Sequence, residues 1–161
     1  MTDFKLNRRG ILKGGAALGA GLATPHFFVR NAHAFTNAPT GSTVTLGFNV
    51  PQTGPYAEEG ADELRAQQLA VKHLNGEGDG GMMNTFSSKA LQGNGILGKK
   101  VEFVTGDTQT KSDAARASAK RMVEADGAVM VTGGSSSGVA VAVQSYCQEA
   151  GIIFMAGLTH A

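Results

Sequence analysis

The chain has 161 residues, of which 42% are hydrophobic and 17% are charged, and it contains one cysteine. A single cysteine excludes an intrachain disulfide. The formal net charge is +1, but five of the fourteen Lys and Arg residues lie in the first 34 positions beside one of the thirteen acidic residues. Residues 35–161 therefore carry nine basic and twelve acidic residues. This balance argues against nucleic-acid binding, which requires a basic surface on the folded part.

The first 34 residues have the three parts of an export signal. They begin with a basic head made by Lys5, Arg8, Arg9 and Lys13. The weakly apolar run GGAALGAGLATPHFFV follows, and residues 32–34 have the A-x-A pattern of a cleavage site. The run is too short and too rich in glycine for a membrane-spanning helix, which needs about 20 apolar residues. The paired arginines in NRRGILK indicate the twin-arginine export machinery, with an ordinary secretory signal as the alternative, and both predict a periplasmic protein.

Strand and helix patterns begin after a linker at residues 35–43. The first predicted strand is VTLGFNV at 44–50, and a helix is expected from Ala57 or Gly60 to Leu74. The i, i+3, i+4 spacing of one helix face predicts that its buried side is made by Ala66, Leu69, Ala70 and Leu74. Asn75-Gly76 is expected to end this helix. The glycine-rich residues 76–98 are expected to form a surface insertion.

The second half of the chain continues the alternation. KKVEFVTGD at 99–107 predicts a strand, and a helix is expected from Ser112 or Asp113 to Ala125, with Asp113 as its N-cap. The apolar face of this helix is expected to be Ala115, Ala119, Met122 and Val123. The apolar run 128–132 predicts a strand that is buried on both faces. A third helix is then expected to start at Ser136 or Ser137 and to end at Gly151, before a last buried strand in GIIFMAG at 151–157.

This order of strands and helices predicts an α/β fold with an open parallel sheet and helices on both faces. Such sheets bind ligands just beyond the carboxyl ends of their strands. The segment GGSSSG at 133–138 lies at one of these ends, before the third helix. Its three consecutive serines, Ser135 to Ser137, can offer hydroxyl groups and helix-start amides to an anion.

The same segment also spells G-x-S-x-G, the strand–turn–helix elbow of serine hydrolases, in which Ser136 would be the nucleophile. A hydrolase of this kind needs an acid and a histidine farther along the chain. After the serines, the only acidic residue in the sequence is Glu149, which lies within the expected helix, and the only histidine is His160. An exported hydrolase therefore stays as an alternative to a binding site.

Other candidate sites are interpreted structurally, and the sequence predicts neither a metal site nor a cofactor. GNGILGKK at 93–100 is similar to a phosphate-binding loop, but Lys100 stands where such a loop needs Ser or Thr. Cys147 is expected to be a packed core thiol, and His73 is expected to lie on a solvated helix face. The acidic residues at positions 58, 59, 62 and 63 are expected to favour the positive end of a helix dipole.

Three segments together resemble exported ABC-transporter substrate-binding proteins of the branched-chain amino-acid (Leu/Ile/Val) class. They are PQTGPYAEEG, GILGKKVEFVTGDTQTKSDAARASAKRMVEADGAVMVTGG and SSSGVAVAVQSYCQEAGIIFMAG. The resemblance implies a type I periplasmic-binding fold, in which two α/β lobes close on an amino acid or related polar solute for delivery to a membrane ABC permease. Residues 44–161 match only part of the amino-terminal lobe, so the second lobe is expected to be absent and the last strand to leave apolar surface exposed.

The resemblance also implies which residues contact the ligand. In the family, the ligand's carboxylate meets a serine at the start of the third helix, and further contacts follow the fourth strand and the first strand. In this sequence those positions are Ser136 and Ser137, then Leu158, Thr159 and His160, and finally Tyr56 or Glu59. The resemblance implies a binding protein and not an enzyme, and a ligand-sensing domain of the same fold is a second alternative.

Overall fold

The computed structural model describes residues 37–39, 41–77 and 95–159. The predicted export signal, most of the predicted insertion and His160 lie outside these residues. Within them, four parallel strands form one sheet in the order β2-β1-β3-β4. The strands are β1 (Thr43–Val50), β2 (Lys100–Asp107), β3 (Met130–Gly133) and β4 (Ile153–Ala156).

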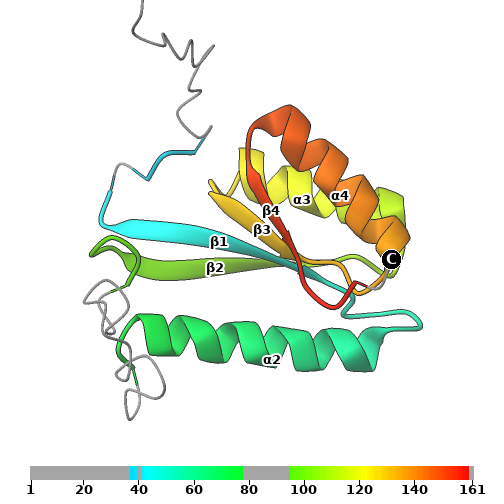
Figure 1. Cartoon of the computed structure of the whole chain (residues 1–161), viewed down its shortest axis with the longest axis horizontal. Helices are drawn as coiled ribbons and strands as arrows, with labels where there is room; N and C mark the ends of the chain where they lie inside the picture. The colour runs from blue at the N-terminus through cyan, green and yellow to red at the C-terminus, as the bar shows by residue number, and fades with distance from the viewer. Residues whose placement is uncertain (1–36, 40, 78–94, 160–161) are drawn as a thin grey trace, which may run out of the picture. The chain divides into compact units, whose positions relative to one another are not determined.

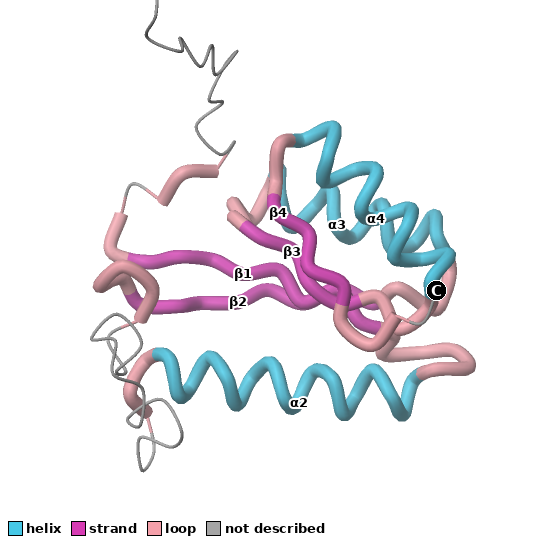
Figure 2. Tube along the Cα trace, viewed as in Figure 1, coloured by secondary structure: helices cyan, strands magenta, loops and turns pink. Residues whose placement is uncertain are grey.

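Helices cover both faces of this sheet, as predicted (Figure 1). They are α2 (Ala57–Leu74), α3 (Ser112–Glu124) and α4 (Ser137–Ala150). Figure 2 shows α2 alone on one face of the sheet and α3 beside α4 on the other. The α/β fold with a parallel open sheet is therefore confirmed. None of the described helices is both long and apolar enough to cross a membrane.

The predicted apolar face of α3 is confirmed. Ala115, Ala119, Met122 and Val123 are all buried in the core between α3, α4 and the sheet. Met122 fills a notch that two glycines leave in the sheet: a Cβ on Gly47 would lie 2.9 Å from its sulfur, and one on Gly106 would lie 2.5 Å from its methyl carbon. The Met122 side chain on α3 therefore occupies the space that the absent side chains of Gly47 and Gly106 leave on β1 and β2.

Cys147 belongs to the same core, as predicted. Its side chain is 1% exposed, and burial raises the pKa of the thiol to about 11. The thiol is therefore protonated and unreactive at neutral pH, because only the thiolate is nucleophilic.

The predicted buried face of α2 is wrong at three of its four residues, while the fourth, Leu74, is partly buried and packs against the core as predicted. Ala66 and Ala70 are exposed and Leu69 is 53% exposed, whereas the helix buries Gly60, Glu63 and Val71. The cause is a close contact that periodicity does not encode. A Cβ on Gly60 would lie 1.8 Å from the carbonyl oxygen of Pro51, so this bare position must face the end of β1. Glu63 and Val71, about one and three turns later on the same side of the helix, are then buried with Gly60.

Helix and turn boundaries agree with the sequence in most places. Asn75 ends α2, and Gly151 ends α4 in the left-handed conformation with φ 68°. Leu97 and Gly98, with φ 53° and 75°, make a turn before β2. The predicted N-cap of α3 is wrong, since Lys111 takes that position and Asp113 lies in the first turn. The charge of Asp113 still favours the positive end of the helix.

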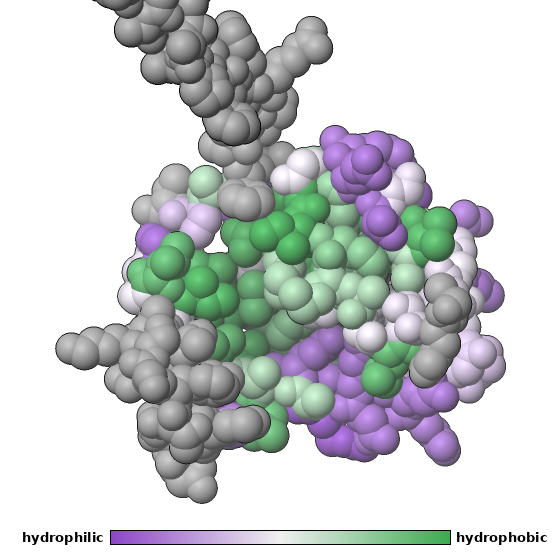
Figure 3. Space-filling model, in the orientation of Figure 1, coloured by the Kyte–Doolittle hydropathy of each residue, from purple (hydrophilic) through white to green (hydrophobic). Residues whose placement is uncertain are grey.

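The strands β3 and β4 are less buried than predicted. In β4, Ile153 is 44% and Met155 is 58% exposed, and in β3 Met130 and Thr132 are half-buried. The reason is that α2 lies beneath β1 and β2 and leaves the same face of β3 and β4 open. Figure 3 shows this face as apolar surface above the polar surface of α2. The exposed apolar surface expected at the last strand is thus observed.

Candidate functional site

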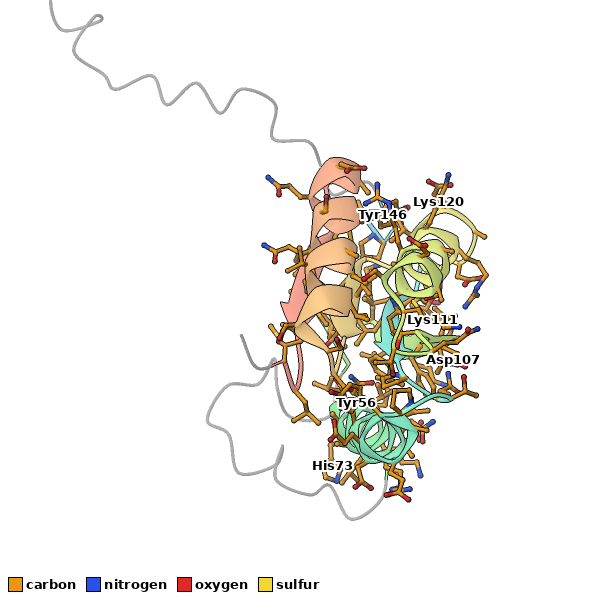
Figure 4. The ribbon with its side chains drawn as sticks, turned by 90° about the vertical axis from the view of Figure 1, so that its right-hand side faces the viewer. Tyr56, His73, Asp107, Lys111, Lys120 and Tyr146 are labelled. Atoms are coloured by element: carbon orange, nitrogen blue, oxygen red, sulfur yellow. The ribbon has the colours of Figure 1, made fainter. Side chains whose placement is uncertain are left out.

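The strand order places a switch point between β1 and β3. The chain moves outward from β1 to β2 in one direction and from β3 to β4 in the other. In open α/β sheets, ligands bind in the crevice outside the carboxyl ends of the strands at such a point. Because all the described strands are parallel, the segments that follow β1, β3 and β4 meet at one edge. Figure 4 looks onto this edge and shows Tyr56 there.

The turn after β3 is shaped by two glycines. Gly133 and Gly134 have φ values of 125° and 87°, which side chains with a Cβ rarely adopt. A Cβ on Gly133 would lie 2.2 Å from the carbonyl oxygen of Asn49, and the Gly134 amide donates to that same oxygen at 3.1 Å. The serine segment that follows, 135–137, is therefore held close against the end of β1.

The start of α4 offers hydrogen-bond donors to an anion. Ser136 is the N-cap residue, and the first helical hydrogen bond runs from the Ala140 amide to the Ser136 carbonyl. The first N–H groups of a helix have no carbonyl acceptor within that helix, and in α4 they include the amides of residues 138 and 139. The first turn of α4 contains no acidic residue, in contrast to the first turn of α2. The positive end of this helix dipole is thus not neutralised by its own side chains.

The three serines differ in their surroundings. Ser135 is 7% exposed, and its Oγ donates to Oε2 of Glu63 at 3.1 Å. Ser136 and Ser137 are half-buried at the start of α4. Within the described part of the chain, the Ser136 hydroxyl makes no capping hydrogen bond, so simple N-capping does not account for it.

The geometry of Ser136 does not fit a nucleophile elbow. That elbow places its serine on a sharp, strained turn between strand and helix. Ser136 instead has φ −115° and ψ 132°, which is ordinary extended backbone. The unusual conformations lie before it, at Gly133 and Gly134. The G-x-S-x-G match is therefore a coincidence of letters at a glycine turn.

The loop after β1 is fixed by a carboxylate that sequence reasoning missed. Asp107, at the end of β2, accepts hydrogen bonds from the amides of Gln52 at 2.9 Å, Thr53 at 3.2 Å and Gln109 at 2.9 Å, and from the Thr53 hydroxyl at 2.6 Å. Partial burial acts to raise the pKa of Asp107, but these hydrogen bonds outweigh it and lower the pKa below its ordinary value. The loop that leads to Tyr56 is therefore tied to the neighbouring strand, and Figure 4 shows both residues at this edge.

The other predicted contact positions also lie at this edge. Tyr56 is the N-cap residue of α2 and is 40% exposed, and Glu59 is exposed in the first turn of the same helix. After β4, Leu158 is 48% exposed and Thr159 is half-buried, whereas His160 lies outside the described residues. The Gly157 amide donates to the Gly133 carbonyl at 3.2 Å, which joins the loop after β4 to the serine turn.

Glu63 has a different role from the one predicted. Glu58 and Glu59 lie in the first turn of α2, where their charges favour the helix dipole, and Asp62 is paired with Arg65. Glu63 is instead 7% exposed, and burial raises its pKa, an effect that the hydrogen bond from Ser135 only partly offsets. The structure thus brings a buried acid to the serine turn. Among the described residues, no group of three or more possible ligands could hold a metal ion.

Glycine turns and a helix start thus lie at the switch point of a layered α/β lobe, the place where open α/β sheets bind their ligands. The chain belongs to the periplasmic binding protein family, whose model matches residues 43–161. This is a family of binding proteins and not of enzymes, as predicted. Residues 5–25 match the signal sequence of the twin-arginine translocation pathway, which confirms the predicted export route to the periplasm.

Relatives with curated names belong to the same class. Leu/Ile/Val-binding protein homolog 7 of Brucella abortus is 27% identical over 115 residues, which are 71% of this chain and 25% of that protein. Leu/Ile/Val-binding protein BraC3 of Rhizobium johnstonii is 30% identical over 112 residues, 70% of this chain and 26% of that protein. The chain therefore spans about a quarter of the length of the curated relatives that it matches.

A solved structure shares the fold. It is the branched-chain amino acid transporter substrate-binding protein LivJ of Streptococcus pneumoniae in complex with isoleucine. The match has a TM-score of 0.61 and 24% identity, and it covers 74% of this chain and 30% of LivJ. At this identity the likeness establishes the fold.

Proposed function

We propose that this chain is part of the first lobe of a periplasmic receptor that captures a small solute with an acidic group for uptake by a membrane ABC permease. The observation that carries the proposal is the start of α4. It combines helix-start amides, two half-buried serines and no acid in its first turn, at the switch point of the sheet. Such a helix start favours a carboxylate through hydrogen bonds and through the helix dipole.

In this proposal, Ser136 and Ser137 donate to the solute's carboxylate. Tyr56 or Glu59 contacts it from the loop after β1. Leu158, Thr159 and His160 contact it from the segment after β4. No covalent step is needed, since capture is completed when a second lobe closes over the bound solute about a hinge.

The proposed solute class is an amino acid or a related small polar molecule. Two curated relatives are named for binding leucine, isoleucine and valine, and LivJ was solved with isoleucine. In this chain Glu59 is exposed at the ligand edge. An acidic side chain at this position favours a solute that is more polar than leucine, or one that carries a cationic group.

The proposal is tested by titration calorimetry on the mature protein, expressed from the longest reading frame that encodes this chain. The probes are the natural amino acids and their carboxamides, which lack the carboxylate. We expect an amino acid to bind more tightly than its carboxamide, and we expect Ser136→Ala and Ser137→Ala to weaken binding. Ser145→Ala is the matched control, because Ser145 is exposed on α4, where its hydroxyl donates to Glu149 at 3.4 Å.

Equal affinity for amino acids and carboxamides, or unchanged binding by both serine variants, contradicts the proposed carboxylate site. Labelling of Ser136 by a fluorophosphonate would instead support the hydrolase alternative, and we expect none.

A further inference from the structure

Glu63 reaches from α2 into the two segments that follow β3 and β4. Its Oε2 accepts a hydrogen bond from Ser135 Oγ at 3.1 Å, although 72 positions separate the two residues. Its Oε1 lies against Gly157 so closely that a Cβ on that glycine would be 2.0 Å away. The Gln67 amide donates to the same oxygen at 3.3 Å. One carboxyl group therefore contacts two of the three segments in which the proposed solute contacts lie.

No opposite charge balances this carboxyl group. Among the described residues, Glu63 takes part in no salt bridge. The facing segments 133–137 and 157–159 contain no ionisable side chain. On α2 itself, Glu59 and Asp62 are acidic, and Arg65 is paired with Asp62 on the exposed side. An ionised Glu63 would thus be a buried negative charge next to the proposed anion site, which is costly unless hydrogen bonds or a nearby cation compensate.

We propose that Glu63 is a positioning and charge-selecting residue of the solute site: its carboxyl group holds the serine turn beside the loop after β4, and in its ionised form it opposes an acidic solute. This inference rests on the proposed function, since it concerns the carboxylate site at the start of α4. It adds a residue from α2 that touches no proposed solute atom and acts through Ser135 and Gly157.

The direction of the effect follows from linkage. Burial already raises the pKa of Glu63 above 4.5 in the free protein. A bound carboxylate nearby raises it further, because two like charges disfavour each other. Binding of an acidic solute therefore takes up a proton, and its affinity falls as pH rises through the titration of Glu63. Each unit by which binding raises this pKa corresponds to about a tenfold loss of affinity across the titration.

The experiment measures the affinity of the mature protein for L-isoleucine and L-isoleucinamide by calorimetry, between about pH 4.5 and 7, a range that covers an upward-shifted carboxyl group. We expect isoleucine to bind about tenfold more weakly at the upper end and isoleucinamide to show no such fall. Glu63→Gln, which is neutral at every pH, is expected to keep the tighter affinity throughout. Glu58→Gln is the matched control: Glu58 is exposed in the first turn of the same helix, and this variant should retain the pH dependence.

An unchanged pH dependence in Glu63→Gln overturns the inference and assigns the titration to another group, for which His160→Gln is the test. A wild-type affinity for isoleucine that is independent of pH also overturns it.

A second measurement needs no solute and separates this inference from the proposed function. In amide NMR spectra of the free protein, the Ser135 and Gly157 signals should titrate together with a midpoint above 4.5, the ordinary pKa of Glu63, and this titration should vanish in Glu63→Gln. If neither probe binds but these signals titrate, the proposed solute is wrong and the positioning role stands. If the signals do not respond to pH, the positioning role is refuted whether or not a solute binds.

Discussion

Replacing Gly133 by alanine tests how firmly the serine turn is held against β1. The φ of 125° at this position is one that an alanine rarely adopts, and the new Cβ would lie 2.2 Å from the Asn49 carbonyl oxygen. That oxygen belongs to the backbone of a central strand and cannot rotate away as a side chain could. Relief therefore requires the turn to move, which breaks the hydrogen bond from the Gly134 amide to the same oxygen.

The expected cost is the sum of two parts. The strained backbone contributes about 1–3 kcal/mol, and the lost hydrogen bond contributes about 1 kcal/mol. The free energy of unfolding should therefore fall by about 2–4 kcal/mol, measured by urea denaturation followed by circular dichroism at pH 7. Affinity for the solute should fall as well, because the start of α4 moves with the turn.

Gly138→Ala is the matched control for this experiment. Gly138 lies in the first turn of α4 with no atom within 4 Å of a built Cβ, and its φ is not positive. Alanine at a compatible helical position stabilises a protein by about 0.5–1 kcal/mol. Opposite signs for the two variants support the close approach at Gly133. A loss of less than about 1 kcal/mol in Gly133→Ala, below the cost of the strain alone, refutes the reasoning.

Three further predictions concern the framework around the site. Met122→Ala should lower the free energy of unfolding by about 2–5 kcal/mol, because this fully buried side chain fills the space beside Gly47 and Gly106. Urea denaturation measures this loss. A loss under about 1 kcal/mol would show that the core collapses around the gap. The pKa of Asp107 is below its ordinary value of 3.8, so the stabilising effect of the carboxylate is present above that value and is lost as pH falls through the lower pKa of the folded protein. Asp107→Asn should lack this loss in acid denaturation curves, and curves that coincide with the wild type contradict the hydrogen-bonded loop. Iodoacetamide should leave Cys147 unmodified in the folded protein at neutral pH and should react with it in urea; mass spectrometry that finds rapid native labelling contradicts its burial.

The sequence predicted the parts of the fold that depend on local patterns. Apolar runs located all the described strands, and the start of α4 was predicted to within a residue because a Gly/Ser segment precedes an amphipathic run. The face of α3 was predicted because its small and apolar residues allow one interpretation. On α2 two apolar stripes compete, and the choice between them depends on the contact of Gly60 with Pro51.

The hydrogen bonds of the candidate site could not be predicted in the same way. The serines were recognisable as helix-start donors, but nothing local indicates that Ser135 is bonded to a residue 72 positions earlier. Glu63 was grouped with the exposed acids of α2, since a run of acids near a helix start has a sufficient local explanation. Asp107 was overlooked because its partners come from the loop after another strand. The contacts of both carboxyl groups depend on how distant segments pack in the fold, which local sequence patterns do not indicate.

The end of α2 and the start of β2 form a closed clasp with a practical consequence. The Gly95 amide donates to the Leu74 carbonyl at 2.7 Å, and the Asn75 side chain bonds both the amide and the carbonyl of Val101. The described residues on either side of positions 78–94 are therefore held together at the amino ends of the strands, across the lobe from the edge that carries the proposed solute site. A reporter peptide or a fluorescent protein inserted between positions 77 and 95 would leave these hydrogen bonds intact, and this makes the position an attachment point for a reporter of solute binding, if the proposed function holds.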